Sequence, residues 1–429
     1  MLRKGWLLYL VLLLALMSAC TDLKQQPQSK SQKQGKIVYS IDELSDSNNA
    51  ARYKKQWDTE TTPTLSDRRQ DVEERNGSSN LNLSFNKIMI KGNRKQVEQK
   101  TNLDVKVDKN LVEPISQGTE WVESFPAGDS KLLEYNGSVL AFITSGQMLL
   151  KRGKQPLKKM TPAIPANWFD MVKVSQNKTI MITGSFEKNS IEIHEVDLKN
   201  GTAKKLSVIE TEGNLKIDPT IVHTKDGYYA TFTDIQGTIN RGNPSQENGR
   251  YTIKLYHSQD LKKWEYVQSI LTEDKNLEDG QLVVDENDQF HFLYEEEEID
   301  RGHSRIKVIS SGDKGKSWGQ AKIILSDMAD HEPSSLMKVN PDRFIFFYSS
   351  DLDHGGTGSY EFANMKYAIL DQQFTVLKKD INLDAESGAS LYDVLKVDNK
   401  LYFIYAKYSN NEEQLALWKI DKKLNDFLE

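Results

Sequence analysis

The chain has 429 residues, of which 38% are hydrophobic and 28% are charged, and its formal net charge is −6. This is the composition of a soluble folded protein, long enough for one large domain or two ordinary ones. The mild negative charge, without a cluster of basic residues, argues against a nucleic-acid partner.

The first residues have the pattern of an export signal. Arg3 and Lys4 precede an apolar run, Trp6 to Met17, that is too short to span a bilayer comfortably. The run ends in "LMSAC", which resembles the signal of bacterial lipoproteins. That resemblance implies cleavage before Cys20 and lipidation of its thiol. The alternative is an ordinary secretory signal with an incidental cysteine.

Cys20 is the only cysteine, so no disulfide can form within one molecule. We therefore expect a signal peptide at 1–19 and a lipidated, polar and partly disordered tether at 20–80. The remaining residues, 81–429, form the expected folded domain. This organisation predicts a protein held by Cys20 on the extracytoplasmic face of the cell membrane.

From about residue 119 onward the pattern is almost entirely β. Short apolar strands alternate with turns such as "YNGS", "KDGYY" and "DENDQ", and no long segment has the helical period. A unit of four strands recurs, starting near residues 131, 170, 218, 279, 332 and 389. Such a repeat predicts an all-β fold, a β-propeller of five or six four-stranded antiparallel blades. A long β-sandwich pair is the competing architecture.

Two turns support a propeller. "SGDKGKSW" (311–318) has the form S-x-D-x-G-x-x-W and resembles the Asp-box of sialidases and other propellers, a structural hairpin at the rim. "HSQDLKKWEYV" (257–267) is a looser version. A sialidase would also need an arginine cluster for the substrate carboxylate. Arginines are sparse at the predicted blade heads, so we rank sialidase activity low.

Acidic residues precede three successive hydrophobic strands, in "IDPTIV", "LEDGQLVV" and "HEPSSL". The first strand of every propeller blade lines the central channel, so these acids should converge on one cavity. Capping of a turn is the simpler interpretation of any one of them, because Asp-Pro and Glu-Pro often open turns. Their even spacing favours a shared site.

At these residues the chain resembles the five-bladed propeller glycosidases of the arabinanase, β-xylosidase and fructan-cleaving types. The resemblance implies Asp218 as base or nucleophile, Asp279 as the acid that orients its neighbours, and Glu332 as general acid. Glu278 is an alternate for the second position. The resemblance spans at most residues 165–420, and here about two blades precede the first acid.

Other candidates follow from their places near blade heads and loops. Aromatic rings that could stack on a sugar are Trp168, Tyr228, Tyr294 and Tyr348, although packing in the core is the simpler interpretation of each. His354 is expected to be exposed on a glycine-rich loop that could reach over the channel mouth. The run "EEEE" (295–298) could bind calcium, but a solvated strand end is the simpler interpretation. The histidines His223, His303 and His331 lack metal-ligand spacing, and no metal or other cofactor is indicated.

The sequence thus predicts a monomeric, lipid-anchored β-propeller that acts on carbohydrate, hydrolysing glycosidic bonds with channel carboxylates. The alternative is a non-catalytic propeller that binds glycan or an envelope protein. An enzyme needs its three carboxyl groups within about 10 Å of one another in an open cavity, whereas a scaffold does not.

Overall fold

The computed structural model describes residues 118–124, 128–186, 188–237, 249–297, 303–354, 356, 362–383, 388–409 and 412–428. All of them belong to one compact unit. The predicted signal, Cys20 and the tether lie outside these residues, as do residues 81–117 of the expected domain. Within the described part of the chain, no helix is long and apolar enough to cross a membrane.

The described strands form six four-stranded sheets, which we call blades I to VI. Blade I contains β2 (Ser130–Tyr135), β3 (Ser138–Thr144), β4 (Met148–Arg152) and β5 (Lys158–Lys159). Blade II contains β6 (Trp168–Ser175), β7 (Lys178–Ser185), β8 (Lys188–Asp197) and β9 (Thr202–Glu210). Blade III contains β10 (Leu215–Thr224), β11 (Gly227–Gln236), β12 (Arg250–Ser258) and β13 (Glu265–Glu273).

Blade IV contains β14 (Asn276–Val284), β15 (Phe290–Glu297), β16 (Ser304–Ser311) and β17 (Lys322–Leu325). Blade V contains β18 (His331–Asn340), β19 (Arg343–Ser350), β20 (Asn364–Asp371) and β21 (Val376–Asn382). Blade VI contains β22 (Ala389–Val397), β23 (Lys400–Ser409), β24 (Glu412–Ile420) and β1 (Thr119–Glu123). Two short 3-10 helices, η1 (Leu352–His354) and η3 (Leu424–Leu428), complete the described elements.

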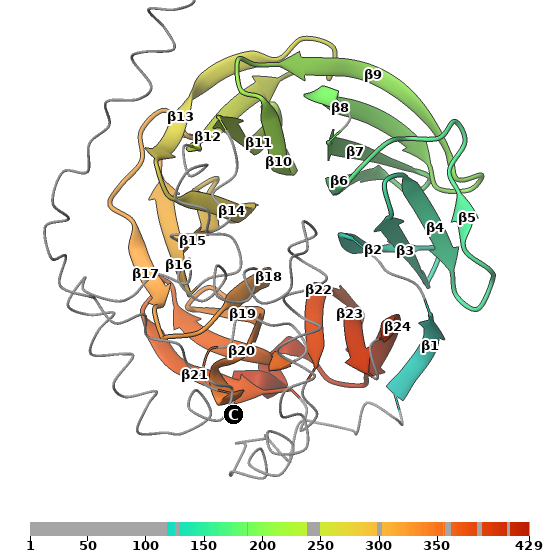
Figure 1. The fold of residues 1–429 in the computed structure, drawn as a ribbon, viewed down its shortest axis with the longest axis vertical. Helices are drawn as coiled ribbons and strands as arrows, with labels where there is room; N and C mark the ends of the chain where they lie inside the picture. The colour runs from blue at the N-terminus through green and yellow to red at the C-terminus, as the bar shows by residue number, and fades with distance from the viewer. Residues whose placement is uncertain are drawn as a thin grey trace, which may run out of the picture. The chain divides into compact units, whose positions relative to one another are not determined.

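The blades stand in a closed ring. Strands β2, β6, β10, β14, β18 and β22 lie nearest its centre, and each contacts the innermost strand of the next blade (Figure 1). All strand pairs within the blades are antiparallel. The ring confirms the predicted propeller and gives six blades, with inner strands that start within a few residues of the predicted repeats. It excludes the sandwich.

The last blade is completed from the other end of the described chain. Strand β1 pairs with β24, with Trp121 opposite Leu417 and Glu123 opposite Leu415. This pairing covers the outer edge of β24, which would otherwise be open to solvent or to another chain. Among the described residues, 119–123 thus close the ring.

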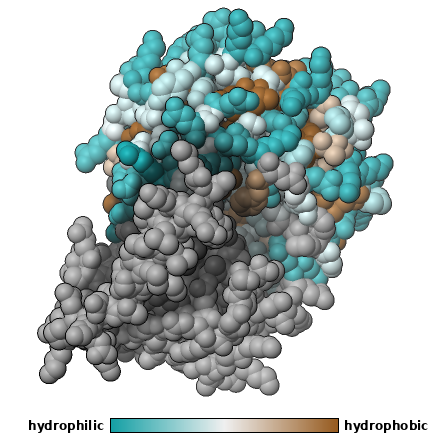
Figure 2. All heavy atoms as spheres, turned by 45° about the horizontal axis from the view of Figure 1, so that its top comes forward, coloured by the Kyte–Doolittle hydropathy of each residue, from teal (hydrophilic) through white to brown (hydrophobic). Residues whose placement is uncertain are grey.

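Hydrophobic side chains fill every seam between neighbouring blades. The described residues form six clusters of buried side chains, one at each seam. The second strand of a blade packs on both sides, so its sequence is almost continuously apolar; β19, with "RFIFFYSS", is buried from Phe344 to Ser350. Outer strands alternate because one of their faces meets water. The surface in Figure 2 is mainly hydrophilic, with small, separate hydrophobic patches.

The predicted hairpin motifs join outer strands. In the turn between β16 and β17, Asp313 accepts the backbone N–H of Ser317 at 2.8 Å, and Ser311 Oγ accepts that of Gly315 at 2.8 Å. Gly315 has φ of 81°, which a residue with a Cβ rarely adopts. The looser motif acts similarly between β12 and β13, where Asp260 accepts the N–H of Lys262 at 2.9 Å. Both are structural at the rim of the ring.

Among the described residues, hydrogen bonds of one kind cross five of the six seams. In each, a side chain on one innermost strand accepts a backbone N–H from the innermost strand of the next blade. The pairs are Asp170 Oδ2 with Ile221 N at 3.0 Å, Asp218 Oδ2 with Asp279 N at 2.8 Å, Gln281 Oε1 with Leu336 N at 2.9 Å, Ser335 Oγ with Val394 N at 3.1 Å, and Asp393 Oδ2 with Leu132 N at 2.7 Å. We call these contacts the seam bonds.

The seam bond of Asp393 predicts a stability effect, because it joins the last blade to the first. Replacing Asp393 by Ala leaves the Leu132 N–H without its acceptor and removes the 3.1 Å hydrogen bond from Ser335 Oγ. We expect the free energy of unfolding to fall by about 1–3 kcal/mol, measured by urea denaturation. Asp398→Asn, at an exposed turn of the same blade, should change it little. Equal stability of the two variants would contradict this role.

Candidate functional site

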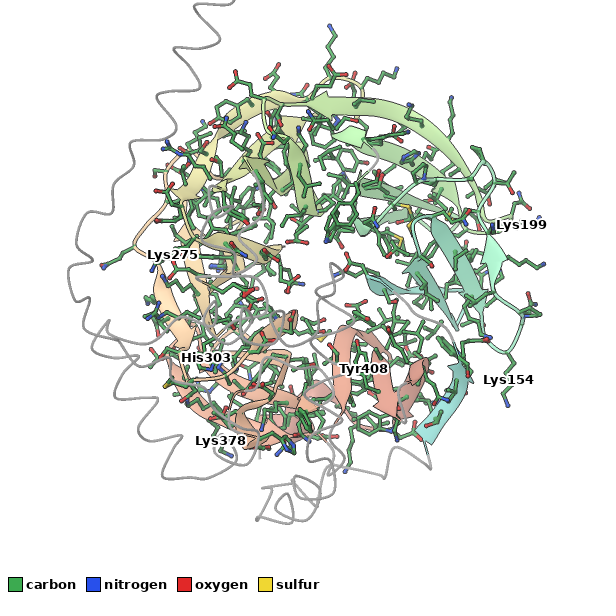
Figure 3. The ribbon with its side chains drawn as sticks, viewed as in Figure 1. Lys154, Lys199, Lys275, His303, Lys378 and Tyr408 are labelled. Carbon is green, nitrogen blue, oxygen red and sulfur yellow. The ribbon has the colours of Figure 1, made fainter. Side chains whose placement is uncertain are left out.

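A cavity of about 440 Å³ opens at the centre of the ring and is lined by residues of all six blades. Figure 3 shows side chains of the innermost strands reaching into this central opening, whereas Lys154 and Lys199 lie on the outer rim. Carboxyl groups dominate the lining: Asp129, Asp170, Asp218, Glu278, Asp279, Glu295, Glu297, Glu332 and Glu413. Lys131 is the only Lys or Arg among the described lining residues.

Asp218 and Asp279 occupy equivalent bulges in successive blades. The register of β10 against β11 shifts between Ile217 and Thr220, and that of β14 against β15 shifts between Glu278 and Gln281. The two aspartates have φ of 48° and 51°, a region that Asp tolerates better than most residues. The bulges turn both carboxyl groups toward the cavity, and the Asp279 N–H donates to Asp218 Oδ2 at 2.8 Å.

The residue after Asp279 has to be glycine. A Cβ on Gly280 would lie 2.5 Å from Cζ of Phe292, which is fully buried on β15. The backbone therefore packs directly on the aromatic ring at this bulge. This close packing fixes the position from which the Asp279 side chain projects.

Glu332 completes the predicted trio from β18. Its carboxyl group and that of Asp279 share a hydrogen bond. Carboxylate oxygens of Asp279, Glu332 and a third residue, Glu295 on β15, all lie within 4.8 Å of one another. The structure thus brings Asp218, Asp279 and Glu332 from three successive blades to one cavity. Glu278, the alternate for the second position, also lines it.

Burial and mutual repulsion raise the pKa values of these acids. Burial, followed by the charge of Asp218, raises the pKa of Asp279 to about 8. Burial and the neighbouring Glu278 hold the pKa of Asp218 well above its usual value, and burial with the charge of Glu332 does the same for Glu295. Protons are therefore retained within this group of carboxyls near neutral pH.

Lys131 balances the carboxyls on the opposite side of the cavity. Burial alone would lower its pKa, but the charges of Asp170, Asp393 and Asp129 outweigh that effect and raise it. The ammonium group therefore stays charged inside the ring. Asp170 and Asp393 themselves make seam bonds, so these two acids hold the blades together.

One of the predicted aromatic residues lines the cavity. Trp168, at the start of β6, packs edge-on against Phe186, with ring centroids 4.6 Å apart. Phe186, which the sequence analysis missed, is 57% exposed, an unusual state for a phenylalanine. The two rings form an apolar face beside the carboxyls.

The other predicted sugar contacts do not line the cavity. Tyr228 stacks on His223 at the turn between β10 and β11, with ring centroids 4.4 Å apart. Tyr294 and Tyr348 lie on second strands, which pack on both faces, and are 2% and 0% exposed. The hydroxyl of Tyr348 donates to Asp380 Oδ1 at 3.0 Å. The structure therefore corrects the assignment of these three tyrosines as substrate contacts.

The predicted role of His354 as a ligand contact is also corrected. It was expected to be exposed on a loop over the channel, but it is 2% exposed and its Nε2 lies 3.2 Å from Asn364 Oδ1. Burial lowers its pKa to about 4, so the ring is neutral at physiological pH. A side chain enclosed in this way cannot reach a ligand in the cavity.

The interpretation of "EEEE" as a solvated strand end was wrong for its described residues. Glu295, Glu296 and Glu297 are 2%, 7% and 4% exposed. Because side chains alternate along β15, Glu295 and Glu297 line the cavity, whereas Glu296 turns away and contacts Lys307 at 2.6 Å. The signal in the sequence for these site residues was that the acids directly continue the apolar run of β15, whose residues are all buried.

No protein-family model and no curated protein sequence matches this chain. Among solved structures, a Dyadobacter fermentans protein of unknown function is similar at 10% identity and a TM-score of 0.47, over 72% of this chain and 97% of that one. An α-L-arabinanase of Penicillium chrysogenum, complexed with arabinobiose, has 11% identity and a TM-score of 0.40, over 60% and 94%.

A sialidase of Trypanosoma rangeli is similar at 11% identity and a TM-score of 0.47, over 70% of this chain and 56% of that chain. Arabinanase, arabinofuranosidase and sialidase structures are thus among its neighbours. At such low identities and TM-scores, the chemistry has to be inferred from the cavity itself.

Asp129 predicts how stability depends on pH. Burial raises its pKa to about 6, while Lys131 and the Phe169 N–H oppose the rise and Asp170 adds to it. The folded state thus holds a proton that the unfolded chain loses near pH 4, so this contribution to stability is present below pH 4 and lost as the pH rises through 6. We expect the fall in unfolding free energy between pH 4 and 7 to be smaller in Asp129→Asn. Parallel urea-denaturation profiles would contradict this.

Proposed function

We propose that this protein hydrolyses glycosidic bonds in the central cavity. The observation that supports the proposal is the convergence of Asp218, Asp279 and Glu332, which three successive blades bring to one opening. Hydrolysis of a glycoside needs one carboxylic acid that gives a proton to the leaving oxygen and one carboxylate that activates water or attacks the sugar. A solvent-accessible group of closely spaced carboxyls can supply both.

In the proposed reaction Glu332 is the general acid. It shares a hydrogen bond with Asp279, and this pair retains a proton in surroundings that resist ionisation. Glu332 passes the proton to the glycosidic oxygen as the bond to the sugar carbon breaks. Asp279 positions the acid and, through its backbone N–H, the carboxyl of Asp218.

Asp218 is the base or nucleophile. Its neighbours disfavour its negative charge, which makes its ionised form a stronger base. As base it takes a proton from the water that attacks the sugar carbon; as nucleophile it bonds to that carbon before water releases the product. Either route adds water across the glycosidic bond, which gives a sugar with a free anomeric hydroxyl and releases the alcohol that was linked to it.

The rest of the cavity suits a carbohydrate. A volume of about 440 Å³ admits a small oligosaccharide or one end of a longer chain. The exposed face of Phe186 beside Trp168 can cover the apolar side of a sugar ring, while the carboxyls and Lys131 bind its hydroxyls. A carbohydrate is therefore the proposed ligand.

The hydrolysis proposal predicts that isosteric amides abolish activity without unfolding the protein. On the aryl-glycosides or polysaccharides that the full chain cleaves, we expect kcat to fall about 10²- to 10⁴-fold in Glu332→Gln and in Asp218→Asn. The matched control is Glu286→Gln, an exposed carboxyl on the turn between β14 and β15. Cleavage that survives in both variants, or a full substrate screen without any cleavage, would contradict the proposal.

We also propose that the protein works outside the cytoplasmic membrane, anchored by lipid on Cys20. The support is the pattern of charged, apolar and small residues that ends at the single cysteine. Acylation of that cysteine would hold the cavity near an envelope or extracellular polysaccharide, and the polar residues that follow would act as a spacer.

The proposed lipid anchor predicts that loss of Cys20 moves the protein from the membrane fraction to the soluble fraction. In a bacterial host, the full chain should sediment with membranes and incorporate labelled palmitate, and Cys20→Ala should do neither. Thr21→Ala is the control and should behave as the unaltered chain. A Cys20→Ala protein that still incorporates palmitate would show that the anchor lies elsewhere.

A further inference from the structure

Three carboxyl groups meet at the seam between blades IV and V. Asp279 comes from β14, Glu295 from β15 and Glu332 from β18, and one oxygen of each lies within 4.8 Å of the other two. Calcium binds protein oxygens at about 2.3–2.6 Å, so two ligands of one ion are at most roughly 5 Å apart. The three oxygens therefore have a spacing that a single calcium ion can bridge.

Glu295 is the member of this cluster that is both buried and incompletely hydrogen-bonded. The residue is 2% exposed, and its Oε1 has no hydrogen-bond partner among the residues that the structure describes. It faces the cavity beside two further carboxyls, so nearby negative charge opposes its ionisation. A buried carboxylate without a partner is strongly unfavourable, and either a proton or a cation relieves it.

The surrounding charge favours a cation. Nine carboxyl-bearing residues line the cavity, as named above, against one lysine among the described lining residues. That lysine, Lys131, lies on blade I and is surrounded by Asp170, Asp393 and Asp129. A cavity lined by one sign of charge concentrates ions of the opposite sign.

We propose that Asp279, Glu295 and Glu332 bind a calcium ion. Calcium accepts irregular sets of oxygen ligands, and water from the cavity can complete its coordination. Magnesium demands shorter distances and a near-ideal octahedral geometry, to which carboxyl groups fixed on three separate strands are less suited. The site joins two blades, so its occupation also stabilises their seam.

A second consequence rests on the proposed hydrolysis. A calcium ion bound to Glu332 occupies the oxygen that would carry the transferable proton. The ion and the reaction then compete for one side chain. Calcium is therefore an inhibitor of the proposed enzyme, and its concentration outside the membrane would set how much of the protein is active.

Binding is tested by isothermal titration of CaCl2 into the full chain, purified in detergent and treated with a chelator. We expect a Kd of about 10⁻⁴ to 10⁻³ M and one ion per chain. Saturating calcium should raise Tm by roughly 2–6 °C. Glu295→Gln should weaken binding at least tenfold, whereas Asp129→Asn, which removes one cavity charge outside the cluster, should change Kd less than threefold.

The outcomes separate the two proposals. Hydrolysis without calcium binding would overturn the site and leave the enzyme. Calcium binding by a protein that hydrolyses nothing even after chelation would do the reverse. Equal effects of Glu295→Gln and Asp129→Asn would mean diffuse attraction instead of a site, and MgCl2 binding as tightly as CaCl2 would overturn the choice of ion. If Glu295→Gln does not fold, Glu332→Gln provides the same comparison.

Discussion

The seam bonds are the contacts on which the rest of the structure depends. Each carries a polar side chain from one innermost strand to the backbone of the next blade, as Asp393 does to Leu132 at 2.7 Å. Apolar clusters hold neighbouring blades together, but they are not directional, whereas a hydrogen bond fixes one register. The innermost strands are thereby aligned. Asp218 and Asp279, which are themselves joined by a seam bond, are brought to the same level of the channel.

The same convergence concentrates negative charge. Wedge-shaped blades leave little room at the centre, so the side chains of six strands share one small volume. The positive charge of Lys131 offsets the charge of some acids, others accept hydrogen bonds from backbone N–H groups, and Asp279 and Glu332 share a hydrogen bond. Glu295 has no such partner for Oε1 among the described residues. Hydrolysis and ion binding are thus proposed in the part of the cavity where crowded carboxyl groups disfavour ionisation most strongly.

Much of this organisation was readable in the sequence. Turn spacing and the four-strand repeat located all six inner strands, and the acids of "IDPTIV", "EDGQLV" and "HEPSSL" were placed in one cavity. The residues that sequence reasoning missed depend on tertiary contacts. Glu295 reaches the site from a second strand and meets Glu332 across a seam, which no local pattern encodes. The prediction that Tyr294 and Tyr348 contact a sugar was wrong because both lie on second strands. These strands are buried on both faces, so the two rings fill the core.

The pairing of β1 with β24 also governs how copies of the chain can interact. Until β1 docks, β24 presents a free row of backbone donors and acceptors, and β1 from a second molecule matches that edge as well as the chain's own. Exchange of this one strand would link two complete rings without altering either cavity. Any such exchange would depend on concentration: a high chain concentration during folding would favour the swapped pair, and dilution the single ring.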